Sequence, residues 1–461
     1  MNKAPLLKPT LLAIAWPIFI EQTLRILIGT VDTFMVSHVS DGAVAALGMA
    51  NQFVVLALIC FNFIGIGASV IITHHVGAND PAGAEKIVTT AIAVNTWIGL
   101  VVSFVTFFFA GPLLRLMQLP PDLMIYALPF LQWMGGTLFL EAMNTAIGAS
   151  LRAHGHTRDA MVVTVIQNLL NIAGNCILLF GLFGAPRLGV TGVALSSVFS
   201  RVVASVILWI LLGRRLRLRL HVRDFIALRL DRIKRILHIG LPAAGEHMSY
   251  WVSLMVITSF AARLGGASLA TMTYTQQVQR LVILFSIALG LGTEILIGRL
   301  VGAGEFEEAY RVVLKSVRTG LIIACGAILL VAAIAPQLLG LFSHDPVIIA
   351  GGSMLLWMSV VYEPGRVFNI VIINALRATG DARFPVQIAA CSQWLFSVPL
   401  SWLLGVRLHF GLPGIWIAMM IEEWFRGIIM YRRWKKRGWM HYARRSREKV
   451  LGDTLPLVPE A

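Results

Sequence analysis

Apolar residues fall in long runs that polar turns separate, and this pattern recurs along the whole chain. A run of about 20 apolar residues is long enough to cross a bilayer as a helix. Runs of this kind lie at residues 11–36, 46–74, 88–110, 124–150, 160–183, 189–212, 236–262, 269–298, 316–339, 346–375, 385–405 and 413–431. The pattern therefore predicts an all-α integral membrane protein with twelve transmembrane helices.

The composition supports a membrane protein and excludes a water-soluble one. Hydrophobic residues make up 57% of the chain and charged residues only 13%, whereas soluble domains carry about 25% charged residues. The first apolar run is too long for a signal-peptide core and is expected to stay as the first span. The four cysteines lie inside apolar runs without paired spacing, which predicts neither disulfides nor a metal site.

The net charge of +15 is unevenly placed. Lys and Arg crowd into residues 213–235 and 432–461, and they recur in every second connection between runs. The other connections hold only Arg115, Arg187, Arg263 and Arg407. Basic connections face the cytoplasm and its anionic lipid, so both termini are expected to be cytoplasmic. This placement removes the need for a nucleic-acid partner.

The chain repeats itself at a fixed offset of 225 residues. Residues that match at this offset include Pro17 and Pro242, Glu21 and Glu246, Gln52 and Gln277, Asn144 and Asn369, Arg152 and Arg377, and Arg201 and Arg426. The repeat predicts bundles of six helices at 1–212 and 236–431, a basic linker at 213–235 and a basic tail at 432–461. Because each half has an even number of spans, the halves are parallel repeats that are expected to enclose a cavity and to move by alternating access.

Ionisable and amide side chains inside spans are costly, so each is a functional hypothesis. Asp32 in the first span has no basic residue one turn away. A carboxyl group in an apolar cavity can bind and release a proton near physiological pH, which points to ion coupling; a carboxylate that caps the next loop is the alternative. Asn168, Asn171 and Asn175 share one side of the fifth span and can bond a carboxyl group, coordinate an ion or hold helices together.

Further residues are candidates for the substrate cavity or a gate. Glu21 and Arg25 are spaced i, i+4 and can neutralise each other. The repeat partner Glu246 points to a gate or to a packing contact. The other cavity candidates are Met35, Gln52, Asn168 and Gln277. Glu363 with Arg366, and Glu422 with Arg426, are expected to be structural pairs within a helix.

No motif for catalysis stands out, so an enzyme is not expected. The chain lacks the nucleotide-binding and zinc-protease signatures. Because ATP would have to be used by a separate subunit, coupling to an ion gradient is the simpler hypothesis. Neither half contains a segment typical of a channel filter.

Three segments resemble signatures of the multidrug and toxic compound extrusion (MATE) family, which belongs to the MOP flippase superfamily. They are Val31 to His38 in the first span, Leu151 to Gly155 with its repeat Leu376 to Asp381, and Asn168 to Gly181 in the fifth span. The resemblance covers about residues 10–430. The resemblance implies a V-shaped transporter, and it implies that the first-span carboxylate, here Asp32, is central to coupling, with Asn171 and Asn175 beside it.

The resemblance also implies a function. The chain resembles the DinF and NorM branches of this family. Members of the family export organic and often cationic compounds in exchange for H⁺ or Na⁺. Sodium-coupled members carry acids in the seventh and tenth spans, where this chain offers Tyr250, Glu363 and Arg366; proton coupling is therefore favoured. We expect a monomer in the bacterial inner membrane without a cofactor. A flippase for lipids or lipid-linked saccharides is the alternative.

Overall fold

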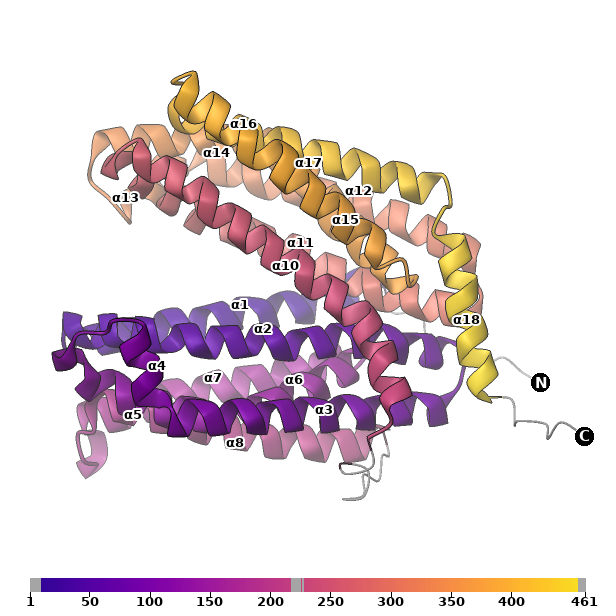
Figure 1. The fold of residues 1–461 in the computed structure, drawn as a ribbon, viewed down its shortest axis with the longest axis horizontal. Coiled ribbons are helices and arrows are strands. Elements are labelled where there is room, and N and C mark those ends of the chain that lie inside the picture. The colour runs from indigo at the N-terminus through magenta and orange to yellow at the C-terminus, as the bar shows by residue number, and fades with distance from the viewer. Residues whose placement is uncertain (1–9, 217–224, 226–227, 455–461) are drawn as a thin grey trace, which may run out of the picture. The chain divides into compact units, whose positions relative to one another are not determined.

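The computed structural model describes residues 10–216, 225 and 228–454, and nearly all of them are helical, with no β-strand in these ranges. The first half contains α1 (Leu11–Ser37), α2 (Asp41–Gly77), α3 (Pro81–Phe108), α4 (Ala110–Leu116), α5 (Met124–Gly136), α6 (Leu138–Ala153), α7 (Thr157–Phe180) and α8 (Gly189–Leu216). The second contains α10 (Leu230–Arg263), α11 (Gly266–Ala303), α12 (Phe306–Ala333), α13 (Ala335–Gly340), α14 (Pro346–Ala378), α15 (Arg383–Ser392), α16 (Val398–Leu400), α17 (Gly411–Lys435) and α18 (Met440–Thr454) (Figure 1). Parts of the predicted linker and tail lie outside the described residues.

The helices account for the twelve predicted spans. Within the described ranges, nine helical segments are long and apolar enough to cross a membrane: α1, α2, α3, α7, α8, α11, α12, α14 and the segment Arg383–Arg407. The bent pair of α5 and α6 supplies a tenth. α10 and α17 have 34 and 25 residues and carry more charge than the others. The prediction of an all-α membrane protein with twelve spans is confirmed.

Two spans are irregular where the sequence shows only an apolar run. α5 and α6 meet at an angle of 44°, next to Gly135, where an added Cβ would lie 2.6 Å from the Thr106 side chain. The eleventh span contains two π-helical segments, Gln393–Ser397 and Ser401–Arg407. Pro399 lies between them and cannot donate a backbone hydrogen bond, so the regular ladder is interrupted there. Apolar periodicity does not report either distortion.

Aspartate side chains cap the starts of α3 and α14. Asp80 accepts a hydrogen bond from the Gly83 backbone N–H at 2.9 Å and precedes Pro81, the first residue of α3. Asp345 caps α14 in the same way, with a bond of 2.9 Å from the Val347 N–H. Both caps satisfy helix N–H groups that would otherwise lack partners, and proline fits the first helical position.

Packing divides the chain into two compact units. Of the described residues, the first unit comprises 10–19, 73–79 and 241–454, and the second comprises 20–72, 80–216, 225 and 228–240. Each unit therefore holds most of the six spans of one half. The first turns of α1 belong to the unit that holds the second half, and the first turns of α10 belong to the unit that holds the first half. The end of α2 also belongs to the unit of the second half.

These helix starts contact equivalent positions in the two units, more closely in the second unit than in the first. In the second unit, a Cβ added to Gly67 of α2 would lie 2.2 Å from the Ile236 carbonyl oxygen of α10. In the first unit, the repeat-equivalent Gly292 of α11 faces Leu11 and Ala15 of α1, with an added Cβ 3.5 Å from the Ala15 side chain. The first helix of each half therefore packs its start against the second helix of the other half. The twofold repeat of the sequence is thus present in the packing.

The ends of α2 and α11 meet within the first unit through backbone contacts. A Cβ at Gly77 would lie 2.0 Å from the Arg299 carbonyl oxygen, and a Cβ at Gly302 would lie 2.0 Å from the His74 carbonyl oxygen. Gly77 and Gly302 are repeat partners, as are His74 and Arg299. Only glycine permits this close approach of two helices at both positions.

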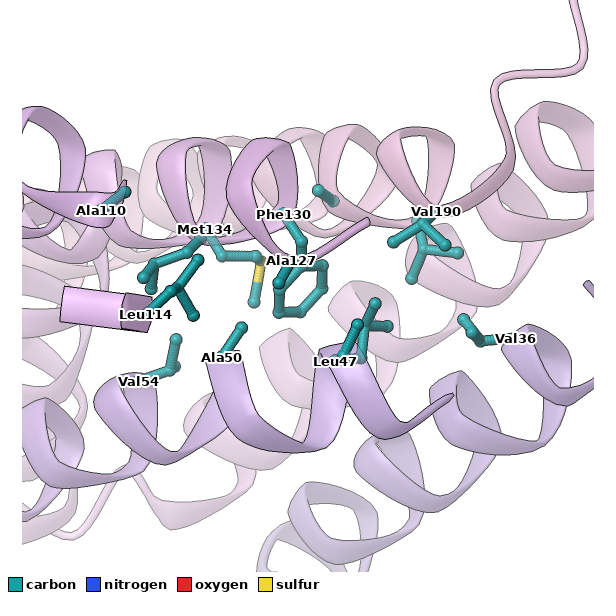
Figure 2. Close-up of a cluster of buried hydrophobic side chains, with 14 of the residues drawn as sticks. Val36, Leu47, Ala50, Val54, Ala110, Leu114, Ala127, Phe130, Met134 and Val190 are labelled. Carbon is teal, nitrogen blue, oxygen red and sulfur yellow. The ribbon is translucent and has the colours of Figure 1, made fainter. Parts of the chain in front are cut away.

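A hydrophobic core holds the end of α1 within the second unit. Val36 belongs to a cluster with residues of α2, α4, α5 and α8, and its side chain is fully buried (Figure 2). Met35 belongs to the same cluster and is 7% exposed, so this predicted cavity residue lies in the core. Because these residues lie one turn from Asp32, the core fixes the helix that carries the candidate coupling residue.

The end of the chain forms a helix, α18, that docks on the second half. α18 runs crosswise to α11 and α12 at their ends (Figure 1). Trp439 stacks on Trp434 with ring centroids 4.3 Å apart, and both side chains are fully buried. Arg447 of α18 lies against Gly304, which ends α11, and Ser446 lies against Gly380, which follows α14. Both glycines have positive φ angles of 80° and 90°, a conformation that suits glycine.

Candidate ion-coupling site

Asp32 and the fifth-span asparagines come together as a hydrogen-bonded group. The Asn175 side-chain N–H donates to Asp32 Oδ1 at 2.6 Å. It also donates to Asn171 Oδ1 at 3.3 Å. Asn171 and Asn175 are fully buried, and α1 and α7 supply the three residues. The two helices therefore bring the predicted carboxylate and amides into direct contact.

Helix α8 holds the amides in place from the other side. Asn171 Nδ2 donates to Ser197 Oγ at 2.8 Å, and Ser196 Oγ donates to the Asn171 carbonyl oxygen at 2.7 Å. An added Cβ at Gly174 would lie 2.3 Å from Ser196 Oγ, so glycine lets α8 approach α7 closely. Asn168, the third predicted amide, donates to the Leu24 carbonyl oxygen at 2.9 Å. It fastens α7 to α1.

The group offers hydrogen-bond partners to both protonation states of Asp32. The Asn175 N–H satisfies an ionised carboxylate, which can only accept. Asn175 Oδ1 is buried and has no hydrogen-bond partner among the residues that the structure describes. A protonated carboxyl group has an O–H that can donate a hydrogen bond to this oxygen. A buried amide that serves both forms is suited to a carboxyl group that exchanges a proton.

Glu21 is the centre of an ion-pair cluster in the first half. Its Oε1 lies 3.2 Å from Arg25 Nη2, as the i, i+4 spacing predicted, and 2.7 Å from Arg152 Nη1. Arg25 also approaches Glu141 at 3.7 Å, and Arg201 pairs with Glu141 at 3.1 Å. Because Glu21 is 1% exposed, its charge is compensated by these arginines rather than by water.

Glu246 has the equivalent pair in the second half. Its Oε2 lies 3.1 Å from Arg377 Nη2, and Arg377 is the repeat partner of Arg152. Arg377 also lies 3.7 Å from Glu294. Each half therefore joins the arginine at the end of its fourth span to the glutamate of its first span.

The two predicted cavity glutamines are exposed and lie outside these clusters. Gln52 of α2 and Gln277 of α11 are exposed side chains. Gln279, two residues further on, is buried instead and donates to Ser359 Oγ at 2.6 Å and to Glu363 Oε1 at 3.4 Å. The buried amide side chain is therefore that of Gln279, which the repeat did not identify.

The second half contains a buried charge cluster larger than the sequence predicted. The predicted pairs occur, with Arg366 at 2.8 Å from Glu363 and Arg426 at 3.2 Å from Glu422. Glu423 joins them, because it lies 3.7 Å from Arg366 and 2.9 Å from Arg426. The expectation of two separate pairs is therefore incomplete. The signal was present in the sequence, since Glu423 directly follows Glu422.

Polar side chains complete the cluster. Ser392, just before the π-helical segment of the eleventh span, donates to Glu422 Oε1 at 2.6 Å. Asn369 donates to the Glu423 carbonyl oxygen at 2.8 Å. The three glutamates are 0–4% exposed. The second half is therefore not poorer in buried charge than the first, although it lacks an equivalent of Asp32.

A many-span helical fold built from two repeats, with compensated charges inside its apolar helices, is typical of a membrane transporter, and the comparisons with known proteins agree. The family model for MatE matches residues 17–177 and 242–403. The chain belongs to the MatE family and is a transporter, not an enzyme. The two matched segments lie in the two halves that the offset identified.

Known relatives extend over nearly the whole chain. An uncharacterized transporter of Bacillus subtilis, YisQ, is 42% identical over 94% of this chain and 95% of its own length. A probable multidrug resistance protein of Thermotoga maritima, NorM, is 24% identical over 98% of this chain and 97% of its own. Among solved structures, a MATE transporter in a bent conformation matches with a TM-score of 0.86 at 21% identity, covering 95% of this chain and 97% of that one. A MOP superfamily transporter from Pyrococcus furiosus matches with a TM-score of 0.82 at 21% identity, covering 93% and 95%.

Proposed function

We propose that the protein is a secondary antiporter that exports organic, cationic or amphipathic compounds by alternating access in exchange for protons. The contact between Asp32 and Asn175 carries this proposal. A relative with 24% identity bears the name of a multidrug resistance protein, which supports drug-like substrates. The alternation of basic connections supports a bacterial inner-membrane location with both termini in the cytoplasm, next to anionic lipid.

In this mechanism, protonation of Asp32 changes the hydrogen bonds between α1 and α7. The ionised carboxylate accepts from Asn175, whereas the protonated form can donate. Asn171 links the same group to α8 through Ser197. A proton taken up from outside would therefore reshape the packing of α1 against α7 and α8 and expel the substrate, and release of the proton to the inside would restore it.

Sodium is the alternative coupling ion. Carboxylate and amide oxygens are hard ligands that suit such a cation, and Asp32, Asn171 and Asn175 supply both types. Efflux should be measured in vesicles with a proton gradient and a sodium gradient imposed separately. Efflux driven by the proton gradient alone is expected, and efflux driven only by sodium would replace the proton in this proposal.

The residue test compares two aspartates of neighbouring helices. Asp32→Asn keeps the size of the side chain and removes its exchangeable proton, so it is expected to abolish efflux driven by the proton gradient. Asp41→Asn, at the exposed start of α2, is the matched control and should transport like the wild type. Proton-driven efflux by Asp32→Asn at the wild-type rate would contradict the assignment. Transfer of a labelled lipid, rather than drug efflux, would favour the flippase alternative.

A further inference from the structure

The first helix of each half passes from one compact unit to the other. In α1 the change occurs after Phe19, and in α10 it occurs after Gly240. Before the change, Ile14 and Ile18 of α1 are buried against Ala288 and Ile295 of α11. The start of α10 is fixed in turn by its close contact with α2 at Gly67. Any movement of one unit relative to the other must therefore deform α1 and α10 at these points.

A proline lies next to each crossing point. Pro17 is inside α1, two residues before the change of unit, and Pro242 is inside α10, two residues after it. A proline within a helix removes one backbone hydrogen bond and clashes with the preceding turn, so a helix bends there more easily than elsewhere. Pro17 and Pro242 are repeat partners. Both helices can therefore flex at equivalent positions.

A partly buried ion pair follows each proline by four residues. Glu21 of α1 is held by Arg152 of α6 at 2.7 Å. Glu246 of α10 is held by Arg377 of α14 at 3.1 Å. In each case both partners belong to one unit. Each pair therefore ties the segment beyond the proline to the bundle of its own half, while the helix start stays with the other unit.

We propose that Arg152 and Arg377 are positioning residues that anchor the first helix of each half just beyond its bend. The anchors confine the deformation of alternating access to Pro17 and Pro242, so that the rest of α1, including Asp32, moves with α7 and α8. Without an anchor, the segment just beyond the proline could shift against its bundle, and the bend would spread along the helix. This inference rests on the proposed function, because the bending is a part of the proposed transport cycle. The anchoring itself can be measured without any substrate.

The test measures distances between spin labels, one in each unit. Phe183 and Leu341 are 94% and 80% exposed and are replaced by cysteine in a chain whose native cysteines are removed. The full-length protein is measured in lipid nanodiscs at two pH values, where the wild type is expected to show a shift between distance populations. Arg152→Gln and Arg377→Gln are each expected to broaden the populations and to slow proton-driven efflux about tenfold, within the usual range of coupling free energies.

Two further variants separate anchoring from general stability. Arg152→Lys keeps the charge and is expected to keep the wild-type distances. It also allows the same residue to be tested if Arg152→Gln fails to fold. Arg201→Gln removes another buried arginine of the same half, 5% exposed, and is expected to lower the melting temperature without changing the distances.

Wild-type distances in both Gln variants, or a change no different from that of Arg201→Gln, would overturn the inference. So would a wild type with a single, pH-independent distance. Absence of efflux from the wild type alongside anchor-dependent distances would instead reject the proposed function and leave the anchors standing.

Discussion

The contact between the fourth and sixth spans differs between the halves although the positions are equivalent. Arg201 of α8 and Arg426 of α17 are identical repeat partners, whereas the repeat partner of Glu141 in the fourth span is Arg366, of opposite charge. Glu141 pairs with Arg201 directly at 3.1 Å. In the second half two arginines would face each other, and Glu423 lies between them, at 3.7 Å from Arg366 and 2.9 Å from Arg426.

The comparison shows which features the repeat fixes and which it leaves free. Asn144 and Asn369 are identical at equivalent positions, and each donates to a backbone carbonyl of the sixth span, at 3.4 Å to Arg201 and at 2.8 Å to Glu423. A backbone contact between these spans therefore occurs in both halves, although the two acceptor carbonyls are not repeat partners. The charges differ, because a buried charge needs only some partner of opposite sign within reach, not one at a fixed position.

The largest expected difference between the halves is the cost of removing the shared arginine. Arg426→Gln would leave Glu422 and Glu423 buried without their closest cation, which is expected to cost about 3–5 kcal/mol in the free energy of unfolding. Arg201→Gln should cost about 1–3 kcal/mol, because Glu141 keeps Arg25 at 3.7 Å. Guanidinium unfolding of both variants in detergent would measure the difference. Equal costs would show that the two clusters are energetically equivalent.

A second prediction concerns Gly77 and Gly302, two repeat partners whose substitution should have the same effect in both halves. Gly77→Ala and Gly302→Ala each place a Cβ 2.0 Å from a backbone carbonyl oxygen, so each should cost about 1–3 kcal/mol through forced separation of α2 and α11. Gly326→Ala is the control, since an added Cβ there meets nothing within 4 Å, and it should be neutral or slightly stabilising. A large cost at only one of the paired glycines would show that the two contacts are not equivalent.

The smallest effect is expected in the connections that follow the fourth and tenth spans. Burial raises the pKa of Asp381, and the hydrogen bond from Arg433 opposes this rise. A carboxyl group whose pKa is raised by folding contributes stability that is lost as the pH rises through the folded-state pKa. As the pH falls from about 7 to about 4, the free energy of unfolding of the wild type should therefore rise by about 1 kcal/mol relative to that of Asp381→Asn.

The equivalent position in the first half is the control for this prediction. His156 is the repeat partner of Asp381 and lies 3.7 Å from Asp159. His156→Asn should not reproduce the same pH-dependent difference, because no buried carboxyl group is lost there. Melting temperatures measured across this pH range would decide, and parallel curves for the wild type and Asp381→Asn would contradict the expected linkage.

Much of the fold could be predicted because the bilayer restricts it so strongly. Apolar runs identify spans, since every backbone polar group in lipid must be paired within a helix. The fixed offset identified the repeat, and its equivalence extends to contacts such as those of Gly77 and Gly302. The spacing of Asn171 and Asn175 placed them on one side of a helix, and both lie in the hydrogen-bonded group with Asp32.

The remaining features depend on contacts between distant parts of the chain. Periodicity on one helix cannot show that Glu423 bridges arginines of α14 and α17, because the partner of a charge is set by packing. It also cannot show that Met35 faces the core, since both sides of a membrane helix are apolar. The exchange of helix starts between the units is invisible for the same reason: α1 is a single uninterrupted run in the sequence.

The docking of α18 has a consequence for biosynthesis. Residues 440–454 leave the ribosome after all twelve spans, so the ends of α11 and α14 at Gly304 and Gly380 stay uncovered until α18 has been synthesised. Trp434 likewise lacks its stacking partner until Trp439 has emerged. A chain that stops before Gly438 would keep all its spans, but Gly304, Gly380 and Trp434 would lose the contacts that Arg447, Ser446 and Trp439 make with them. The packing of this end of the second half therefore depends on residues that emerge only after the last span.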